Sequence, residues 1–589
     1  MATVRRRSRV TPSRASTAVA EPRVEARPEG WTLLGDLLVE SGRVTHPQLA
    51  EVLLAQGSSG KRLGTLLVEL GLVDEHDLAV ALAEQFDLPL LDLRAEYPEA
   101  EAAELLPETL ARALTAVPLG FDEDDVVGVA LADPQPEIQQ QVRAAVGRKV
   151  TFVVAAPSDI RRAINHIYRA ISDIDDLVKR FEKSEGGRSA VTTPEKVGEA
   201  LADDAPVVQV VNRLITQALR DRASDLHIEP QDKRLRIRFR IDGALHDVLS
   251  LPENIGPGLV SRIKILAGMN IVERRRPQDG QIATVVDGRE VDIRVSTTGT
   301  IWGEKVVLRV LDKSRPLYKL GELGMPADTY ETYAKMVRSP FGMVICAGPT
   351  GSGKTTTLYA TLSEINEPHR NIMTIEDPVE YVFPSINQIQ MNEQAGLSFA
   401  TGLKSILRQD PDVILVGEAR DVETARIAIQ SALTGHFVLS SLHATDAVAA
   451  LHRFLDMGIE SFLIASSVVG VVGQRLVRRT CTYCKAPYKP TAEELAYFRE
   501  MGGTGKRAFY AGTGCNSCSG TGYMDRIGVY ELLPITPEIK RLVVGWATQE
   551  ELRRMAVSQG MRTLQDEALQ LVKDDVTTID EVVRSIYAF

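Results

Sequence analysis

The residues with the clearest chemistry form a glycine-rich segment that ends in lysine and threonine. It matches the pattern GxxxxGK[ST], between an expected strand and an expected helix. Glycines let backbone N–H groups surround phosphate oxygens, and the helix start adds a positive dipole. Lys354 would bind the β- and γ-phosphates, and the Thr355 hydroxyl would bind Mg²⁺. The alternative is a chance glycine-rich turn. The predicted ATP-binding residues are Gly348, Pro349, Thr350, Gly351, Ser352, Gly353, Lys354, Thr355 and Thr356.

Carboxylates follow two other apolar segments. The apolar run 413–416 ends in Gly417 and Glu418, and Glu418 would face the Mg²⁺ ion and its water shell. The segment TIEDPVE at 374–380 contains Glu376, Asp377 and Glu380, and one of these could polarise the attacking water. The alternative for this second segment is a solvated acidic turn. Together with the glycine-rich loop, the acids indicate ATP hydrolysis rather than binding alone.

Two histidines flank another apolar strand. His436 precedes the run FVLSSL and His443 follows it. A neutral imidazole there could sense or orient the γ-phosphate. A purely structural role stays open for both, and more so for His436 than for His443, which lies at the strand end.

Four of the five cysteines form two CxxC pairs. Thiolate knuckles of this kind suit a closed tetrahedral zinc site with a structural role. In a reducing compartment such pairs favour metal binding over disulfides, although four free thiols remain the alternative. The fifth, Cys346, lies in an apolar run and is expected to pack in a strand. The predicted zinc ligands are Cys481, Cys484, Cys515 and Cys518.

The elements that must position these groups form several domains. Apolar strands separated by helices are typical of a buried parallel sheet, and they predict an ATPase core over 339–475. A mixed domain with alternating strands precedes this core at 205–313, joined by a connector at 314–338. The predicted linker 171–204 is charged and contains Gly and Ser. A cysteine-bearing insert at 476–530 and a helical segment at 531–589 complete the chain.

The N-terminal part contains an internal repeat. Residues 33–56 and 62–85 align with an offset of 29, and each copy predicts a short helix, a turn and a longer helix. Short strands and helices follow, so that 31–170 reads as a helical repeat plus a small α/β module. Residues 1–30 are basic and without apolar periodicity, which predicts a disordered tail. The overall fold class is α/β multidomain.

The composition restricts the function. The net charge is −11 and aromatic residues make up 5% of the chain, which disfavours a nucleic-acid-binding protein. No apolar run reaches the roughly 20 residues that span a bilayer, and the basic N-terminus has no apolar segment of a secretory signal behind it. We therefore expect a cytoplasmic protein whose membrane contact is peripheral or through partners.

Four motifs resemble those of the secretion ATPase superfamily, in its GspE/PilB branch. The motifs are GPTGSGKTTTLY, TIEDPVEY, LRQDPDVILVGEARDVETA and TGHFVLSSLHATDA. The resemblance implies a RecA-like core in which Lys354 and Thr355 contact phosphate and Mg²⁺, Glu380 is the general base, Glu418 is the Walker B acid and His443 is the His-box residue. Ala419 stands where the family usually has Ile, which is a packing change.

The same resemblance extends to both flanking parts. The segments ASDLHIEP, RFRIDG and ERRRPQDGQI are similar to a PAS-like capping domain, in which Arg294 and Arg309 are spaced like arginine fingers. The family's loop STLPTxxGEK reads STTGTIWGEK here, without the proline. The cysteine-bearing insert is similar to that of assembly-type members, and retraction-type members lack it.

The tandem repeat resembles an MshE-like regulatory domain that binds cyclic di-GMP. The first copy has Leu33 where the second has Arg62. A helical docking module with a leucine core is the alternative. The resemblance implies cyclic di-GMP contacts at Leu34, Gly35, Leu38, Arg62, Leu63, Gly64 and Leu67.

The function implied is a homohexameric motor that uses ATP, Mg²⁺ and Zn²⁺ to drive type IV pilus assembly or type II secretion. Its partner would be an inner-membrane platform protein, at the inner face of the cytoplasmic membrane. A RecA-like nucleic-acid translocase and a cyclic di-GMP sensor with secondary ATPase activity are the alternatives. The sequence does not separate pilus assembly from secretion.

Overall fold

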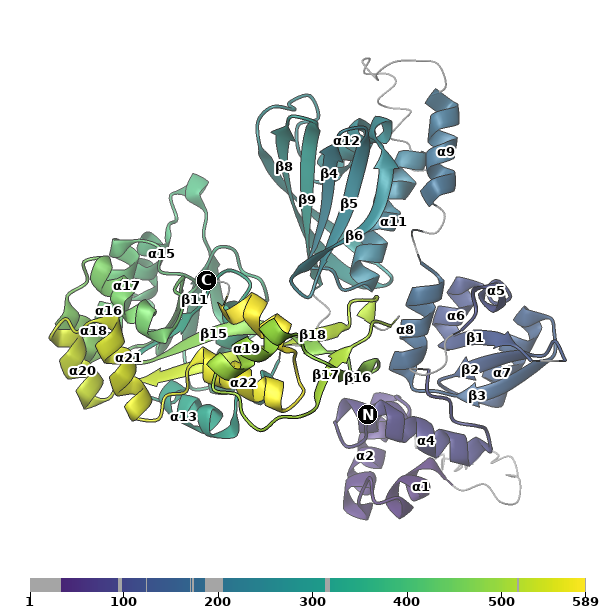
Figure 1. Ribbon diagram of the computed structural model, residues 1–589, viewed down its shortest axis with the longest axis horizontal. Helices are drawn as coiled ribbons and strands as arrows, with labels where there is room; N and C mark the ends of the chain where they lie inside the picture. Colours follow the sequence, from purple (N-terminus) through teal and green to yellow (C-terminus); the bar gives the residue numbers. More distant parts are fainter. Residues whose placement is uncertain are drawn as a thin grey trace, which may run out of the picture. The chain divides into compact units, whose positions relative to one another are not determined.

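The computed structural model describes residues 33–93, 98–122, 124–169, 171, 174–185, 205–312, 318–515 and 518–587. The chain divides into two compact units, Met1–Arg161 and Arg162–Phe589, with the division inside one helix. Each unit is described by itself (Figure 1). The fold is α/β and multidomain, as expected. The predicted basic tail 1–30 lies outside the described residues.

In the first unit the tandem repeat folds as two helix pairs. The pairs are α1 (Leu34–Glu40) with α2 (His46–Ser59), and α3 (Leu63–Glu69) with α4 (Glu75–Phe86). Their leucines and valines form one shared core. A side chain at Gly35 would approach Leu49 within 3.0 Å, and one at Gly64 would approach Leu78 equally closely. These repeated glycines therefore allow each short helix to pack against the longer helix of its own pair.

A three-stranded sheet follows in the same unit. Its order is β1-β2-β3, with β1 and β2 antiparallel and β2 and β3 parallel. Ala79 and Ala83 of α4 pack against Val154 and Ala156, so that the repeat and the sheet share a small core. The elements are α5 (Ala100–Ala103), α6 (Glu108–Leu114), β1 (Ala116–Phe121), β2 (Val127–Leu131), α7 (Pro136–Val146), β3 (Val150–Val154) and α8 (Pro157–Ile167).

The predicted linker begins with a helix, which corrects the sequence interpretation. Residues Ile174–Glu185 form α9, which packs against α11 (Pro206–Arg220). Ile174, Leu177, Val178 and Phe181 are buried in the core of the following domain. Their spacing of three and four residues marks one face of a helix, although the charged composition suggested a linker. Residues 186–204 lie outside the described part of the chain.

The mixed domain is a six-stranded antiparallel sheet of order β6-β5-β4-β9-β8-β7. Alternate residues such as Leu226, Ile237 and Leu308 are buried together with the apolar side of α11. The other set of alternate residues is mostly polar or charged, as in β5, where it consists of arginines. The elements are β4 (Asp225–Gln231), β5 (Arg234–Ile241), β6 (Ala244–Pro252), η1 (Glu253–Ile255), α12 (Gly256–Leu266), β7 (Gln278–Val286), β8 (Arg289–Thr300) and β9 (Gly303–Asp312).

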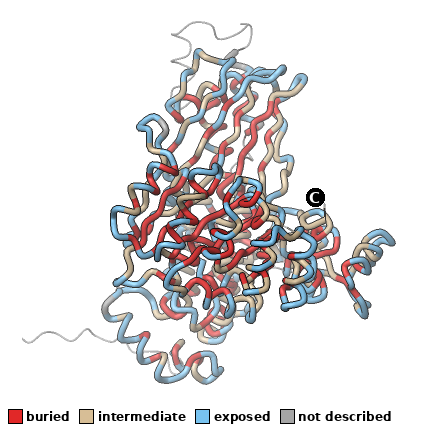
Figure 2. Tube along the Cα trace, turned by 90° about the vertical axis from the view of Figure 1, so that its left-hand side faces the viewer, coloured by how far each residue is buried: buried red, intermediate tan, exposed pale blue. Residues whose placement is uncertain are grey.

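The core contains a seven-stranded sheet of order β12-β11-β13-β14-β10-β15-β18. Its strands run parallel except β18, which is antiparallel to β15. Figure 2 shows buried residues following the strands, and β10 is buried along its whole length. The elements are β10 (Gly342–Ala347), α14 (Lys354–Ile365), β11 (Ile372–Glu376), β12 (Asn387–Gln390), η3 (Glu393–Ala395), α15 (Phe399–Ile406), β13 (Val413–Val416), α16 (Val422–Leu433), β14 (Phe437–Leu442), α17 (Ala447–Asp456), α18 (Ser461–Ser467), β15 (Val468–Thr480) and β18 (Tyr523–Pro534).

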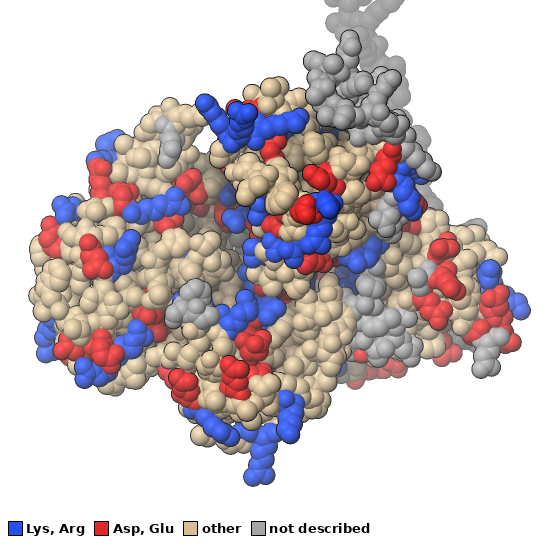
Figure 3. Space-filling view, turned by 45° about the horizontal axis from the view of Figure 1, so that its top comes forward, with Lys and Arg blue, Asp and Glu red and all other residues tan. Residues whose placement is uncertain are grey.

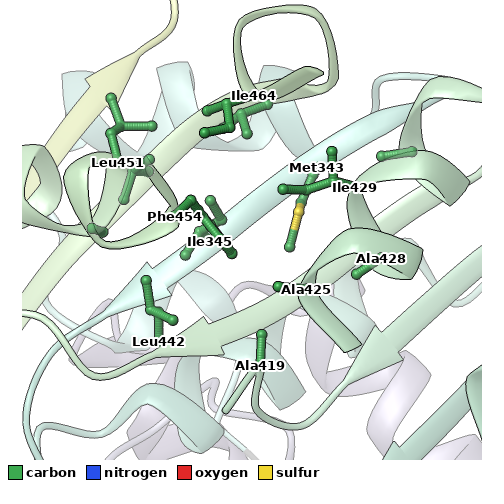
Figure 4. Close-up of a cluster of buried hydrophobic side chains, with 14 of the residues drawn as sticks. Met343, Ile345, Ala419, Ala425, Ala428, Ile429, Leu442, Leu451, Phe454 and Ile464 are labelled. Carbon is green, nitrogen blue, oxygen red and sulfur yellow. The ribbon is translucent and has the colours of Figure 1, made fainter. Parts of the chain in front are cut away.

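One large apolar cluster supports this sheet (Figure 4). Met343 and Ile345 of β10 meet Ala425 and Ile429 of α16 in it. Ala419 is 3% exposed and belongs to the same cluster. The exchange of the family's usual Ile for alanine is therefore a change in packing, as expected.

Three predicted boundaries differ from the structure. In the predicted connector 314–338, η2 (Leu320–Glu322) and α13 (Ala327–Val337) belong to the core. Tyr333 is fully buried and bonds Thr361 at 2.7 Å. The strands β15 and β18 cross the expected limits at 475/476 and 530/531, because their pairing continues to Thr480 and Tyr523. The cysteine-bearing insert is therefore 481–522, at the end of a long hairpin.

In its described residues the insert contains a small antiparallel pair and an α-helix, and a helical segment follows β18. Thr491, Thr548 and Thr563 each begin a helix with a capping box. No helix among the described residues is long and apolar enough to cross a membrane. The elements are β16 (Lys485–Tyr488), α19 (Ala492–Glu500), β17 (Phe509–Gly512), α20 (Pro537–Val544), α21 (Gln549–Ser558), α22 (Leu564–Lys573), α23 (Ile579–Val582) and η5 (Val583–Tyr587).

Candidate functional site

The glycine-rich loop lies between β10 and α14, as its sequence predicts. Gly351 and Gly353 have φ values of 78° and 87°, which residues with a side chain rarely adopt. A Cβ at Gly348 would lie 2.6 Å from the Gln474 carbonyl oxygen. The loop therefore requires glycine at these positions, and it opens directly into the N-terminus of α14. This geometry is a cradle for phosphate.

Lys354 is the cation of this loop. Its Nζ donates hydrogen bonds to the carbonyl oxygens of Gly348 at 2.8 Å and Pro349 at 3.0 Å. Burial lowers the pKa of Lys354, while the charge of Glu418 opposes that shift. The amine is thus held close to the loop and near the carboxylate that follows β13.

That carboxylate belongs to Glu418, which contacts the predicted residue His443 and also Arg420. Glu418 Oε1 lies 3.1 Å from His443 Nε2, and Glu418 Oε2 accepts a hydrogen bond from Arg420 Nε at 2.8 Å. Gly417 makes this possible, since a side chain there would lie 3.2 Å from the Ile375 carbonyl oxygen. The ends of β13 and β14 therefore bring Glu418 and His443 together. His436 instead places Nδ1 3.1 Å from the Ser431 carbonyl oxygen at the other end of β14, which fits a structural role.

The acids after β11 differ in environment. Glu376 is 4% exposed and is bonded by the hydroxyls of Tyr359 and Thr374. Glu380 is exposed, and its backbone N–H donates to Tyr359 Oη at 3.1 Å. The Glu376 carboxylate thus stabilises the segment through these hydrogen bonds, whereas the Glu380 carboxylate is accessible to a water molecule. Burial raises the pKa of Tyr359, so its hydroxyl keeps its proton.

The two predicted arginine fingers are neighbours across β8 and β9. Arg309 lines the same cavity as the glycine-rich loop, and its Nε donates to Asp225 Oδ1 at 3.0 Å. Arg240 lies 3.4 Å from the other oxygen of Asp225 and lines the cavity as well. Arg294 is not among the residues that line it. The structure therefore places Arg309 and Arg240, rather than Arg309 and Arg294, toward the loop.

One cavity of about 860 Å³ collects these groups. Its walls include the glycine-rich loop from Pro349 to Thr356, and also Glu380, Glu418 and His443. Sequence reasoning missed several cationic, apolar and hydroxyl-bearing residues of the wall, because nothing distinguishes them from ordinary strand and helix residues. Those residues are Arg240, Arg475, Leu476, Arg526, Arg584 and Ser585.

The four predicted cysteines converge in the insert. Their sulfur atoms all lie within 4.8 Å of one another. The Sγ–Sγ distances are 3.8 Å for Cys481–Cys515, 3.9 Å for Cys484–Cys518 and 3.7 Å for Cys515–Cys518. A tetrahedron with zinc–sulfur bonds of about 2.3 Å has edges of about 3.8 Å, so the four sulfurs fit zinc. Backbone N–H groups of Cys515 and Gly522 also donate to Cys518 Sγ, both at 3.2 Å.

The remaining cysteine is apart from this cluster. Cys346 is fully buried in β10, and burial raises the pKa of its thiol to about 12. It packs as an apolar strand residue, as expected.

The predicted cyclic di-GMP contacts divide into two groups. Leu38 and Leu67 are fully buried in the repeat core, and Gly35 and Gly64 are buried where their helices pack. Arg62 is exposed and pairs with Asp133 of the same unit. Of the predicted set, only Leu34, Arg62 and Leu63 have exposed or half-exposed surface to offer a ligand.

Comparisons with known proteins identify related families. The model for "Type II/IV secretion system protein" matches residues 200–584, and the model for "MshEN domain" matches residues 86–186. The chain is 39% identical to the type IV pilus assembly ATPase PilB of Myxococcus xanthus, over 93% of this chain and 98% of that protein. It is 40% identical to the type II secretion system protein E of Xanthomonas campestris pv. campestris, over 94% and 98% respectively.

Among solved structures, the chain is similar to the pilus retraction motor PilT with bound ADP. The match covers 63% of this chain and 96% of that one, at 25% identity and a TM-score of 0.45.

Proposed function

The chain belongs to the type II/IV secretion system protein family, and we propose that it hydrolyses ATP to drive type IV pilus assembly or type II secretion. The observation that carries the proposal is the single cavity in which the phosphate cradle, Glu380 and the Glu418–His443 pair meet. Relatives of both kinds match almost the whole chain at nearly equal identity, so the proposal names both machines.

In this proposal the loop and Lys354 bind the phosphates through backbone N–H groups and one positive charge. Thr355 and Glu418 would hold Mg²⁺, which neutralises charge on the phosphate oxygens when it is bound. Their hydroxyl and carboxylate oxygens are the ligand types that Mg²⁺ prefers, and both residues line the cavity.

The exposed Glu380 is proposed to accept a proton from the attacking water. His443, already paired with Glu418, would respond to the γ-phosphate beside it. Arg309 and Arg240 supply positive charge from the capping domain, which would stabilise charge that spreads over the transferred phosphoryl group. Arg294 stays in the proposal only as an arginine offered to another subunit, since it does not line this cavity.

The assembly is proposed to be a homohexamer acting on an inner-membrane platform protein, at the inner face of the cytoplasmic membrane. Motion of the capping domain against the core would be the mechanical output. Zinc bound by the four cysteines would hold the insert together, since thiolate–zinc bonds contribute directly to folding.

Cyclic di-GMP is proposed as a regulator of the N-terminal unit. The MshEN domain model matches residues 86–186, directly after the tandem repeat that carries the predicted contacts, and this match supports a regulatory role for that part of the chain. Leu34, Arg62 and Leu63 are the predicted contacts with surface to offer, and binding would require Arg62 to exchange Asp133 for a ligand group.

A nucleic-acid translocase is the competing function, and surface charge weighs against it. On the face shown in Figure 3, Lys and Arg are interspersed with Asp and Glu. A protein that grips phosphates along a strand usually carries a continuous basic surface. Salt-dependent binding of DNA by the purified protein would favour the translocase.

The decisive test compares ATP hydrolysis by the wild type and by Glu418→Gln, with light scattering in the presence of ATP. We expect a hexamer in both, and a loss of turnover of more than about 100-fold in the variant. Glu423→Gln is the matched control, because Glu423 is exposed and pairs with Lys404 outside the cavity. A wild type that stays monomeric and never hydrolyses ATP would contradict the proposed function.

A further inference from the structure

The order of the core sheet gives the nucleotide cavity two sides. The loop follows β10, which lies between β14 and β15. Glu380, Glu418 and His443 follow β11, β13 and β14, all on one side of β10; we call them the catalytic flank. Leu476 of β15, Arg526 of β18 and Arg584 of η5 line the cavity from the other side; we call them the nucleoside flank.

The nucleoside flank touches the glycine-rich loop directly. Gln474 Nε2 donates to the Ser352 carbonyl oxygen at 2.7 Å, and its side chain is 1% exposed. Leu476 lies 3.5 Å from the Cβ position of Gly353. If the γ-phosphate is directed to the catalytic flank, the ribose and base would extend toward Leu476, which offers an apolar surface.

Arg584 completes this wall and is held in place by a buried carboxylate. Its Nε and Nη2 donate to the two oxygens of Glu581, at 2.8 Å and 2.5 Å. Glu581 is fully buried and also accepts from the backbone N–H and Nε of Arg478, at 3.0 Å and 2.8 Å. The Arg584 side chain is 46% exposed, so part of its guanidinium remains open toward the cavity.

The pairing decides which part of a nucleotide Arg584 suits. Glu581 occupies two nitrogens of the guanidinium, and its carboxylate, although shared with Arg478, lies behind the group and opposes a phosphate in front of it. The flat face of an arginine that is paired in this way can still stack on an aromatic ring. The chemistry therefore fits the base of the nucleotide rather than its phosphates.

We propose that Arg584 binds the nucleoside end of ATP by laying its guanidinium plane on the base, and that Glu581 positions it there. The inference rests on the proposed function, in that the cavity must accept ATP. It adds a specificity element from the C-terminal η5 to a site otherwise built by the core motifs. ATP and ADP share the base, so Arg584 should affect both alike.

The experiment compares ADP with inorganic pyrophosphate, each with Mg²⁺, by calorimetric titration of the full-length, zinc-loaded protein. We expect Arg584→Ala to weaken ADP binding about ten-fold, a typical value for a lost stacking contact. Binding of pyrophosphate, which has no base, should stay within about two-fold of the wild type. Arg541→Ala is the matched control, because Arg541 also pairs with a glutamate three residues earlier but lies outside the cavity.

The role of Glu581 is tested by the same ratio. Glu581→Gln should weaken ADP more than pyrophosphate, and adding it to Arg584→Ala should weaken ADP little further, because coupled residues are not additive. Should Arg584→Ala fail to fold, Arg584→Lys keeps the charge and loses the plane, and it should weaken ADP several-fold.

Three outcomes would overturn the inference: unchanged ADP binding, an equal loss for ADP and pyrophosphate, or wild-type ADP binding in Arg584→Lys. A wild type that binds ADP but does not hydrolyse ATP would contradict the motor alone and leave this test valid. A wild type that binds neither ligand would overturn both.

Discussion

The catalytic flank and the nucleoside flank line the same cavity, but they are built from different kinds of structural element. Glu418 and His443 follow buried parallel strands, and the chain places them through short turns. The nucleoside flank instead combines the edge of the sheet with a C-terminal turn, and its residues Leu476 and Arg584 are more than one hundred positions apart. The proposed catalytic residues are therefore positioned by inner strands of the sheet, and the residues proposed to bind the base are positioned by its less enclosed edge.

The two flanks should consequently respond to different perturbations. A change on the catalytic flank should alter turnover and leave nucleotide affinity intact. A change near the nucleoside flank should alter affinity and leave turnover at saturating ATP intact.

The largest expected effect is on the catalytic flank. Glu380→Gln should lower kcat about 10²–10⁴-fold, the usual contribution of a general base, because the amide cannot accept a proton from water. Affinity for ADP should not change. Steady-state hydrolysis and ADP titration measure both, with Glu367→Gln as the control, since Glu367 pairs with Arg370 outside the cavity. A normal kcat in this variant would show that the general base is a residue other than Glu380.

Removing zinc should act on the nucleoside flank. The ends of β15 and β18 carry the cysteines, and they also hold the C-terminal segment: Thr480 N–H donates to the Val576 carbonyl, and Thr577 Oγ1 donates to that of Arg478. Cys481→Ser with Cys515→Ser should abolish zinc binding and lower the melting temperature. ADP binding should weaken by about 0.5–2 kcal/mol, with little change in kcat.

Zinc content by elemental analysis, calorimetry and the melting temperature check this prediction. Cys346→Ala serves as the control, because Cys346 lies outside the cluster and should leave zinc content unchanged. An equal loss of kcat and of ADP affinity would show that the two flanks are not separable.

The last effect is on folding stability rather than on turnover or affinity, and it concerns Glu531 of β18. It is 1% exposed and accepts from the N–H groups of Ala447 at 2.9 Å and Leu564 at 3.3 Å. Burial raises its pKa from 4.5 to about 7. Between these values the unfolded chain releases the proton and the folded chain keeps it, so this group lowers stability as pH rises from 4.5 to 7.

The amide of the Glu531→Gln variant does not ionise, so the variant does not lose stability in this way as pH rises. The stability of the variant relative to wild type should therefore rise by about 1–3 kcal/mol between pH 5 and pH 8 and level off above pH 7. Chemical denaturation at several pH values measures it. A difference that does not depend on pH would mean that Glu531 is ionised in both states.

Sequence reasoning succeeded where chemistry is encoded in contiguous motifs. The glycine-rich loop, Glu418 and His443 meet in one cavity, because short turns follow their strands. The four cysteines meet in the insert, because the β15–β18 hairpin brings the two CxxC pairs together. It failed for Arg240, Arg526 and Arg584, whose roles depend on which distant segments meet, and an arginine in a strand or helix gives no local signal. The family resemblance named Arg294 together with Arg309 as arginine fingers. Arg294 lies beside Arg309 in the β8–β9 pairing but does not line the cavity, because the spacing of motifs does not say which faces of separate domains meet.

The N-terminal repeat shows a different limit. Aligning the copies identified Leu38 and Leu67 as equivalent. The same residue can recur in both copies because it packs in a shared core or because it contacts a ligand. Burial separates these causes, and it places both leucines in the core. For α9, helical spacing was present in the sequence, and its charged composition concealed it.

The register of the β15–β18 hairpin bears on how the cysteine-bearing insert can vary in evolution. Thr480 pairs with Tyr523, so the two strands approach closely where the cysteine-bearing insert begins and ends. A short turn could join them there, and the entropy of closing a longer segment grows only slowly with its length. Phe498 and Phe509 of the insert share an apolar core with Leu564 of the C-terminal segment. A chain that exchanged this module could therefore keep its strand pairing, but its C-terminal helices would have to repack.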